Sequence, residues 1–280
     1  MPSRFILLAC GVISFSAAAF AETLRVPQDY TLIQRAAWAA APGDTIQIAE
    51  GTYFENVVVT KSITVKGAGI GKTILAGKDR ASPVLALNGK GGAIAGSDFT
   101  IRHEPAPQLP VDPNSTEPPV EDMSEGLSIF SGDLSLKNVE VRNSSGQGVW
   151  VAAGKAVVDR VTIVAPGSTG LHVYETLPGT TISNITVQDA QGGYDLTAYQ
   201  AAAVFKNLML TGKAMGFIQI EGSKSAVTFP GIDADLKARI EWLDGASPDG
   251  VPQKTAEGGE GQDEGEYAYT YLFDAQFGYL

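Results

Sequence analysis

The chain has 280 residues, enough for one or two domains with a sizeable core, and carries a formal net charge of −11 at pH 7. This charge argues against a nucleic-acid partner, which would require a basic face. One cysteine, two histidines and four methionines offer few ligands for a transition metal, so we expect no cofactor, although a calcium site built from carboxylates remains compatible with the composition.

The first 21 residues predict a secretory signal peptide. Arg4 supplies a basic start, residues 5–20 are apolar or small, and Ala19-Phe20-Ala21 matches an A-x-A cleavage site. The apolar stretch is too short for a convincing membrane span, and Cys10 leaves lipidation as an alternative. Cleavage after Ala21 would remove the single cysteine, so we expect a disulfide-free protein in the periplasm or outside the cell.

An internal repeat begins at successive glycines, at Gly126, Gly148, Gly170 and Gly193. Each unit contains three short apolar strands, and a polar corner precedes the third strand; the corner residues are Asn138, Asp159 with Arg160, Asn184 and Asn207. One such coil cannot bury its inward side chains alone, so coils must stack. The chain is therefore predicted to be all-β, a right-handed parallel β-helix (a solenoid), with a β-sandwich as the alternative.

The ends of the solenoid are predicted from composition. Thr31 can cap a short N-terminal α-helix over residues 32–41, whose apolar stripe would close the tube. The predicted organisation is a signal peptide over residues 1–21, the β-helix over 22–243, an acidic Gly-rich linker over 244–266 and an aromatic C-terminal strand over 267–280. Residues 102–125 carry six prolines and six acidic residues and are expected to form a loop.

Residues 23–75 resemble the start of pectin-lyase-like β-helix proteins, in particular pectin methylesterases. The resemblance is carried by Tyr30, Ile33, Gln34, Ala36 and Ala37, by Pro42-Gly43-Asp44, by residues 51–57 (GTYFENV) and by Gly67-Ala68-Gly69. It implies secretion and polysaccharide substrates, and assigns Glu55 and Asn56 to structural roles. The catalytic motifs of these enzymes are missing: no Gly-Arg-Pro-Trp of the methylesterases and no Gly-His-Gly of the polygalacturonases occurs.

Stacking the first strands of four repeats places Trp150, His172, Tyr174 and Asp195 on one outward face. An exposed aromatic ring beside a carboxylate and an imidazole is the set that binding of a sugar, or acid–base chemistry on it, would need. We therefore predict that Trp150 and Tyr174 bind substrate and that His172 and Asp195 are catalytic. The competing interpretation is that the aromatic rings only pack against their neighbours.

The Pro-rich loop leaves its coil just before this face. In pectin-lyase-like proteins, loops on this edge wall the binding cleft, so the resemblance implies that His103, Glu121 and Asp122 approach the face as substrate-binding residues. Paired carboxylates there could bind calcium or act as acid and base, and the competing interpretation is a solvated acidic loop.

Two functions of different classes are compatible with these features. The first is an exported protein that binds or processes a polysaccharide along the outward face, as a lyase, esterase or hydrolase. The alternative is a non-catalytic structural, adhesion or envelope-maturation protein that binds a protein partner through the same face or the aromatic strand. A periplasmic metal-delivery helper is disfavoured because ligands are scarce.

Overall fold

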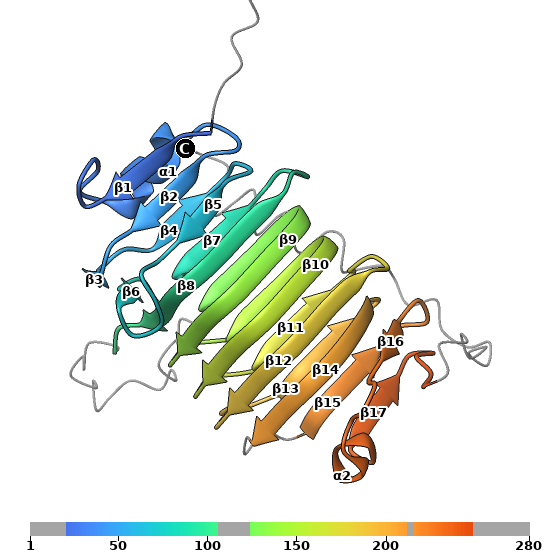
Figure 1. Cartoon of the computed structure of the whole chain (residues 1–280). Coiled ribbons are helices and arrows are strands. Elements are labelled where there is room, and N and C mark those ends of the chain that lie inside the picture. The colour runs from blue at the N-terminus through green and yellow to red at the C-terminus, as the bar shows by residue number, and fades with distance from the viewer. Residues whose placement is uncertain (1–20, 106–123, 212–215, 249–280) are drawn as a thin grey trace, which may run out of the picture.

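The computed structural model describes residues 21–105, 124–211 and 216–248, in which parallel strands wind as a right-handed β-helix (Figure 1). Successive turns of the helix stack in chain order from the blue N-terminal end to the orange C-terminal end. The strands are β1 (Thr23–Val26), β2 (Thr45–Ile48), β3 (Gly51–Tyr53), β4 (Val57–Val59), β5 (Thr64–Lys66), β6 (Thr73–Gly77), β7 (Leu85–Asn88), β8 (Ile94–His103), β9 (Leu127–Arg142), β10 (Val149–Val164), β11 (Leu171–Tyr174), β12 (Thr180–Gln188), β13 (Tyr194–Tyr199), β14 (Ala202–Thr211), β15 (Gly216–Glu221), β16 (Ala226–Thr228) and β17 (Ile240–Leu243). The predicted fold class is confirmed.

Parallel pairing arranges the strands in three columns along the tube. Column 1 contains β4, β7, the first parts of β9 and β10, and then β11, β13, β15 and β17. Column 2 runs from β1 and β2 through β5 and the starts of β8, β12 and β14 to β16. Column 3 contains β3, β6 and the ends of the long strands from β8 to β14. Each backbone N–H and C=O of an inner coil therefore finds its partner in a neighbouring coil.

The core lies inside the tube and consists of aliphatic side chains from all three columns. The inward residues predicted for the third strands of the first three repeats, Val139, Val141, Val161, Ile163, Ile185 and Val187, are all at most 1% exposed, whereas Leu208 and Leu210 of the fourth are only partly buried. Alternate residues face outward because side chains of a strand alternate between its two sides. The inward rows are thus continuous stacks of Val, Ile and Leu, which is the burial that a single coil cannot achieve.

The polar corner between columns 2 and 3 adopts a left-handed backbone. Asp98, Asn138, Arg160, Asn184 and Asn207 have φ values of 64°, 54°, 53°, 55° and 52°. Asn and Asp tolerate this conformation better than most residues. Their side chains also bond along the stack, since the Asn184 amide donates to Asp159 Oδ1 at 2.6 Å and the Asn207 amide donates to Asn184 Oδ1 at 3.0 Å.

Helix α1 (Ile33–Ala39) closes the N-terminal end, as predicted, but Thr31 does not cap it. The Glu55 carboxylate accepts hydrogen bonds from the backbone N–H groups of Ile33 at 2.9 Å and Gln34 at 3.1 Å. A carboxylate from the first coil thus satisfies donors that a local cap would otherwise serve. Ile33 and Ala36 are fully buried against the tube, and the structural role expected for Glu55 is confirmed.

Asn56 has a structural role too, and binds the chain segment that precedes β7. Its amide donates to the carbonyl oxygens of Asp79, Ser82 and Pro83, and its carbonyl oxygen accepts from the N–H groups of Lys78 and Asp79. One side chain therefore holds a whole turn in place.

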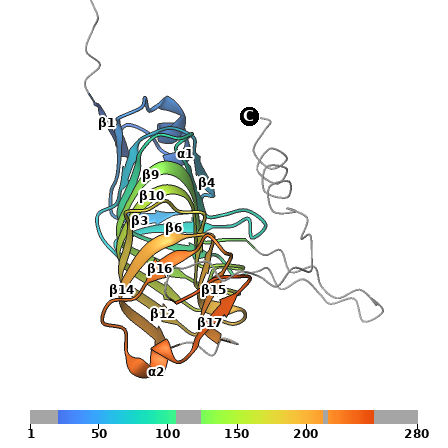
Figure 2. The same ribbon diagram turned by 90° about the vertical axis from the view of Figure 1, so that its right-hand side faces the viewer.

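The other end of the tube is less enclosed. Figure 2 shows α1 and β1 at one end and β17 with α2 (Ala234–Lys237) at the other. Helix α2 buries none of its residues, and the last inward side chains, including Ile240 and Trp242, are only partly buried. The predicted signal peptide, most of the Pro-rich loop and nearly all of the predicted linker and aromatic strand lie outside the described residues. Within the described ranges no helix is long and apolar enough to cross a bilayer.

The inward register predicts a strong difference between neighbouring positions of β12. Replacing the fully buried Ile185 by Asp should prevent folding, because an unpaired charge in the core costs several kcal/mol against about 5–15 kcal/mol of total stability. Thr186→Asp, one residue further and facing outward, should leave the melting temperature within a few degrees of wild type. Thermal melts followed by circular dichroism compare the two variants, and similar melting temperatures would contradict the register.

Two substitutions of Asn184 separate the contributions of the left-handed backbone and of the side-chain hydrogen bonds to the stability of the stacked corners. Asn184→Gly removes the side-chain hydrogen bonds but keeps the left-handed backbone accessible, so it should cost about 1 kcal/mol. Asn184→Ala adds a strained Cβ at φ 55° and should cost about 1–2 kcal/mol more. Urea unfolding measures both, and equal stabilities for the two variants would show that the backbone conformation is unimportant.

Candidate functional site

The face predicted to carry function is the outer side of column 1, here called the first-strand face. In every coil before the last, the inward neighbours of these positions are buried aliphatic residues, so the alternating residues point away from the tube. The outward residues, in order along the stack, are Val58, Ala86, Asn88, Ser128, Phe130, Trp150, Ala152, His172, Tyr174, Thr197, Tyr199, Gln219, Glu221, Glu241 and Leu243.

Aromatic rings from adjacent coils contact one another along this face. The Trp150 ring centroid lies 6.2 Å from that of Phe130, 5.0 Å from that of His172 and 6.4 Å from that of Tyr174. Tyr174 and Tyr199 stack with centroids 5.1 Å apart and ring planes only 11° from parallel. Pairing of β11 with β13 places these two tyrosines side by side, one coil apart. This row of aromatic rings therefore ends in a stacked pair of nearly parallel tyrosine rings.

Trp150 lies on this face as predicted, but it is not exposed. Only 6% of its surface is accessible, and Ala152 and Ser128 beside it are 7% and 4% exposed. His172 and Tyr174 are half-buried. Rings only one interstrand spacing apart cover each other, and a central ring loses more surface than one at the end. Packing against neighbours, the competing interpretation, accounts for the observed position of Trp150.

Asp195 does not share the exposed face, and this prediction was wrong. Leu171 pairs with Leu196, so the residue beside His172 in the next coil is Thr197. Asp195 falls at the position of Gly170, where a Cβ atom would come within 2.4 Å of the inward Val187. Its side chain is accordingly fully buried. The predicted adjacency of His172 and Asp195 fails because the coil from Leu171 to Leu196 is longer than the two coils directly before it.

His172 is held as an uncharged imidazole at neutral pH. Its Nδ1 atom lies 2.5 Å from the Thr197 hydroxyl oxygen, and its ring contacts Trp150 and Tyr174. Burial among these groups lowers its pKa from 6.5 to about 4. An imidazole in this state can accept or donate a hydrogen bond but adds no positive charge to the face.

His103 was expected on a loop approaching the face, and this placement was wrong. It ends β8 and is 2% exposed. Its Nδ1 accepts a hydrogen bond from the Ser145 N–H at 3.0 Å, so Nε2 donates to the Ser82 carbonyl at 3.1 Å. Burial lowers the pKa of this imidazole, which joins two backbone segments as a structural residue. Glu121 and Asp122 lie outside the described residues.

Two face residues, Tyr199 and Glu221, were missed by the sequence reasoning. Pairing of β13 with β15 puts Glu221 one coil beyond Tyr199, in line with Tyr174. Burial, followed by the hydrogen bond and negative charge of Asp244, raises the pKa of the Glu221 carboxyl. The signal was present in the period-2 pattern of both strands, but the register at the fourth repeat was set two residues too early.

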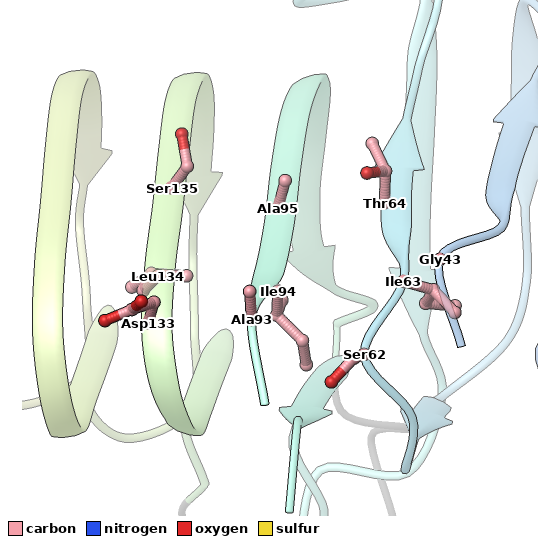
Figure 3. A pocket seen from close by; sticks show the side chains of 10 residues that line it. All are labelled: Gly43, Ser62, Ile63, Thr64, Ala93, Ile94, Ala95, Asp133, Leu134 and Ser135. Atoms are coloured by element: carbon pink, nitrogen blue, oxygen red, sulfur yellow. The ribbon is translucent and has the colours of Figure 1, made fainter. Parts of the chain in front are cut away.

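A separate hollow lies on column 2, about 400 Å³ in volume (Figure 3). It is lined by the starts of β5 and β8, the turns before β2, β5 and β8, and the middle of β9, through Gly43, Ser62, Ile63, Thr64, Ala93, Ile94, Ala95, Asp133, Leu134 and Ser135. None of the predicted site residues lies there. In the described part of the chain, no group of three or more His, Cys, Asp or Glu side chains is arranged to hold a metal ion.

Comparison with known proteins supports the architecture. Among solved structures, a pectin methylesterase mutant in complex with a hexasaccharide has 14% sequence identity and a TM-score of 0.50, with 85% of this chain and 98% of that chain covered. The chain has the pectin-lyase-like parallel β-helix fold. Pectin methylesterase PemA from Erwinia chrysanthemi (14% identity, TM-score 0.42, 80% and 92% covered) and an alginate lyase from Paenibacillus sp. (14%, 0.37, 81% and 99%) are also similar. No family model and no curated protein sequence matches the chain.

The low pKa of His172 predicts a pH-dependent loss of stability. Between pH 6.5 and about 4 the unfolded chain binds a proton that native His172 does not, so folding free energy is lost as the pH falls through this window. The loss between pH 7 and pH 4.5 should be about 2–3 kcal/mol. Urea unfolding at pH 7 and pH 4.5 measures it, with His172→Asn as control; this variant keeps a hydrogen-bonding group near Thr197 and should lose less. Equal losses in the two proteins would mean that His172 titrates normally.

Proposed function

We propose that this protein acts outside the cytoplasm and binds a polysaccharide along the first-strand face. The observation that carries the proposal is the stacked Tyr174–Tyr199 pair, which presents two nearly parallel rings from adjacent coils. Tyrosine rings combine an apolar face with a polar edge, and sugars present apolar ring faces edged by hydroxyl groups. The extracytoplasmic location rests on the signal peptide expected over residues 1–21.

The groups around the tyrosine pair suit hydrogen bonding to sugar hydroxyls. Gln219 points outward next to the pair, and Asn88 points outward further along the same track; both amides can donate and accept. The Thr197 hydroxyl is buried and engaged by His172. Coils rise by about 4.8 Å, so several coils offer an extended track rather than a closed pocket. A solved pectin methylesterase of this fold holds a hexasaccharide, which supports an extended ligand here too.

Trp150 and His172 support the tyrosine pair rather than forming the contact surface. Trp150 is buried beneath its neighbours, and His172 is fixed between Trp150 and Thr197. Such packing keeps the tyrosine rings in one orientation, which reduces the entropy lost when a ligand binds.

Whether a chemical step follows binding is a separate question, and the catalytic roles of His172 and Asp195 remain predictions. A lyase, esterase or hydrolase would need an acid or base within reach of the bound sugar. His172→Ala and Asp195→Ala variants distinguish the classes: turnover lowered about 100-fold with binding retained indicates catalysis, whereas loss of binding alone indicates a binding protein.

A structural protein that binds a protein partner is the second candidate. The observation that favours it is the incomplete burial of the last coil, where the inward Ile240 and Trp242 are only partly buried and Leu243 is 40% exposed. Exposed apolar groups clustered at one end of a fold mark an interaction site more often than scattered ones do. Such a protein would use this end of the tube, together with the aromatic residues 267–273.

Truncation of the tyrosine pair tests the proposed function. Tyr174→Ala and Tyr199→Ala should each weaken binding of the cognate polysaccharide by about 1–3 kcal/mol, by comparison with stacking of bases on aromatic side chains. Stability should change little because both residues point away from the core. Trp38→Ala is the matched control, since this aromatic side chain is 61% exposed on α1, away from the face. Affinity electrophoresis measures retardation, and tyrosine variants that behave like Trp38→Ala would refute the proposal.

A further inference from the structure

We propose that the first-strand face selects polysaccharides of uncharged sugars and rejects polyuronates, the polymers that carry a carboxylate on each sugar. This inference rests on the proposed function and names the class of ligand. It follows from the charges on the face rather than from the fold, which does not determine the ligand.

The face lacks cationic side chains in the described part of the chain. None of the outward residues of the paired column 1 segments, from Val58 to Leu243, is Lys or Arg. The charged residues among them are the acids Glu221 and Glu241. Carboxylates are usually bound by the bidentate guanidinium of Arg or the ammonium of Lys, so a chain of uronates would find no such partner along these strands.

The edges of the face do not compensate for this absence. On the side where the chain enters column 1, Glu125 lies against Ser124 and Ser128. Arg239, just before β17, is a cation on this side of the last coil, and its guanidinium is held over the Phe217 ring at 4.5 Å, two residues before the outward acid Glu241. On the side where the chain leaves, the corners carry Lys61, Lys90, Lys155 and Lys224 as well as Asp133, Glu175 and Asp244, and the Lys61 ammonium is occupied by the Trp38 and Ala40 carbonyls at the end of α1. The borders thus carry both signs of charge, while the outward rows of the strands between them are acidic and the whole chain carries −11.

His172 would be the remaining source of positive charge on the face, and its surroundings keep it neutral. Its ring is covered by Trp150 and Tyr174, and Nδ1 is engaged by Thr197. At neutral pH a uronate would meet uncharged rings, amides and hydroxyls along the track and a carboxyl pair at Glu221 and Asp244. Two like charges about 4 Å apart repel by about 1–4 kcal/mol near a protein surface. An anionic polymer would meet this repulsion, whereas a neutral polymer would not.

The same groups favour neutral sugars. The Tyr174–Tyr199 pair can pack against an uncharged pyranose ring, and Gln219 points outward in the neighbouring row, paired with Thr197. The Gln219 amide can donate to and accept from sugar hydroxyls, and the Glu221 carboxyl, in line with Tyr199, can accept from them. A neutral sugar can therefore make all of these contacts, and none of them requires a cation to neutralise a charge on the ligand.

The test is affinity electrophoresis of the full-length protein in gels containing one soluble polysaccharide at about physiological ionic strength. The neutral probes are hydroxyethyl cellulose, galactomannan and neutral arabinoxylan; the anionic probes are polygalacturonate and alginate. We expect retardation by at least one neutral polymer, with an apparent affinity about tenfold or more above that for either polyuronate, and loss of this retardation in Tyr199→Ala.

A charge reversal then tests the electrostatic cause. Glu221→Lys should gain retardation by polygalacturonate at low ionic strength, about tenfold over wild type, and lose the gain as salt is added. Glu50→Lys is the matched control, since it makes the same change in net charge at an exposed corner between β2 and β3. Glu221→Gln removes the charge without adding one and shows, by its melting temperature, whether the position tolerates substitution.

The failures of the two proposals are distinguishable. Retardation of wild type by polyuronates as strong as by neutral polymers, and abolished by Tyr199→Ala, would overturn the selectivity while leaving the binding face intact. A gain in Glu50→Lys equal to that in Glu221→Lys, or no gain in Glu221→Lys, would also overturn it. Absence of retardation by every polymer, or retardation unaffected by Tyr199→Ala, would refute polysaccharide binding by this face itself.

Discussion

The structure depends on one constraint, the hydrogen bonding of each coil to the coils before and after it. In a parallel β-helix the strand N–H and C=O groups point along the tube axis, so a coil without neighbours leaves them unpaired. The inward aliphatic rows impose the same demand, since a side chain inside the tube is shielded only when coils lie on both sides. Stacking therefore determines the register, and the register determines which residues share the outer face.

This dependence explains which features could be predicted from the sequence. The alternation of apolar residues and the polar corners at Asn138, Asn184 and Asn207 are local signals, and both were read correctly. The apolar stripe of α1 was equally visible. Its cap was not, because Glu55 reaches the helix from a different coil and no local motif marks such a contact.

The site was harder to predict because its composition depends on coil length. Paired positions advance by 22 residues from Val149 to Leu171, but by 25 from Leu171 to Leu196. Counting from glycines hid this difference, placed Asp195 beside His172 and left out Tyr199. The burial of Trp150 was not predicted for another reason. A periodic pattern shows which side of a strand a residue occupies, but not what packs over that residue. His103 was misplaced because β8 continues to that residue before the chain leaves the strand.

The longer coil has a consequence for how such a protein can diversify. Most of the extra length lies after β11, at the corner between columns 1 and 2, where Leu171 and Thr181 are two residues further apart than Val149 and Val157 in the coil before; the remaining residue lies at the corner between columns 3 and 1. The pairing of β13 with β11 and β15 nevertheless stays in register, and paired positions advance by 22 residues again, from Leu196 to Ile218 and from Ile218 to Ile240. Length changes at these two corners are thus uncoupled from the core, so variation can remodel both borders of the outer face while the tube is inherited unchanged.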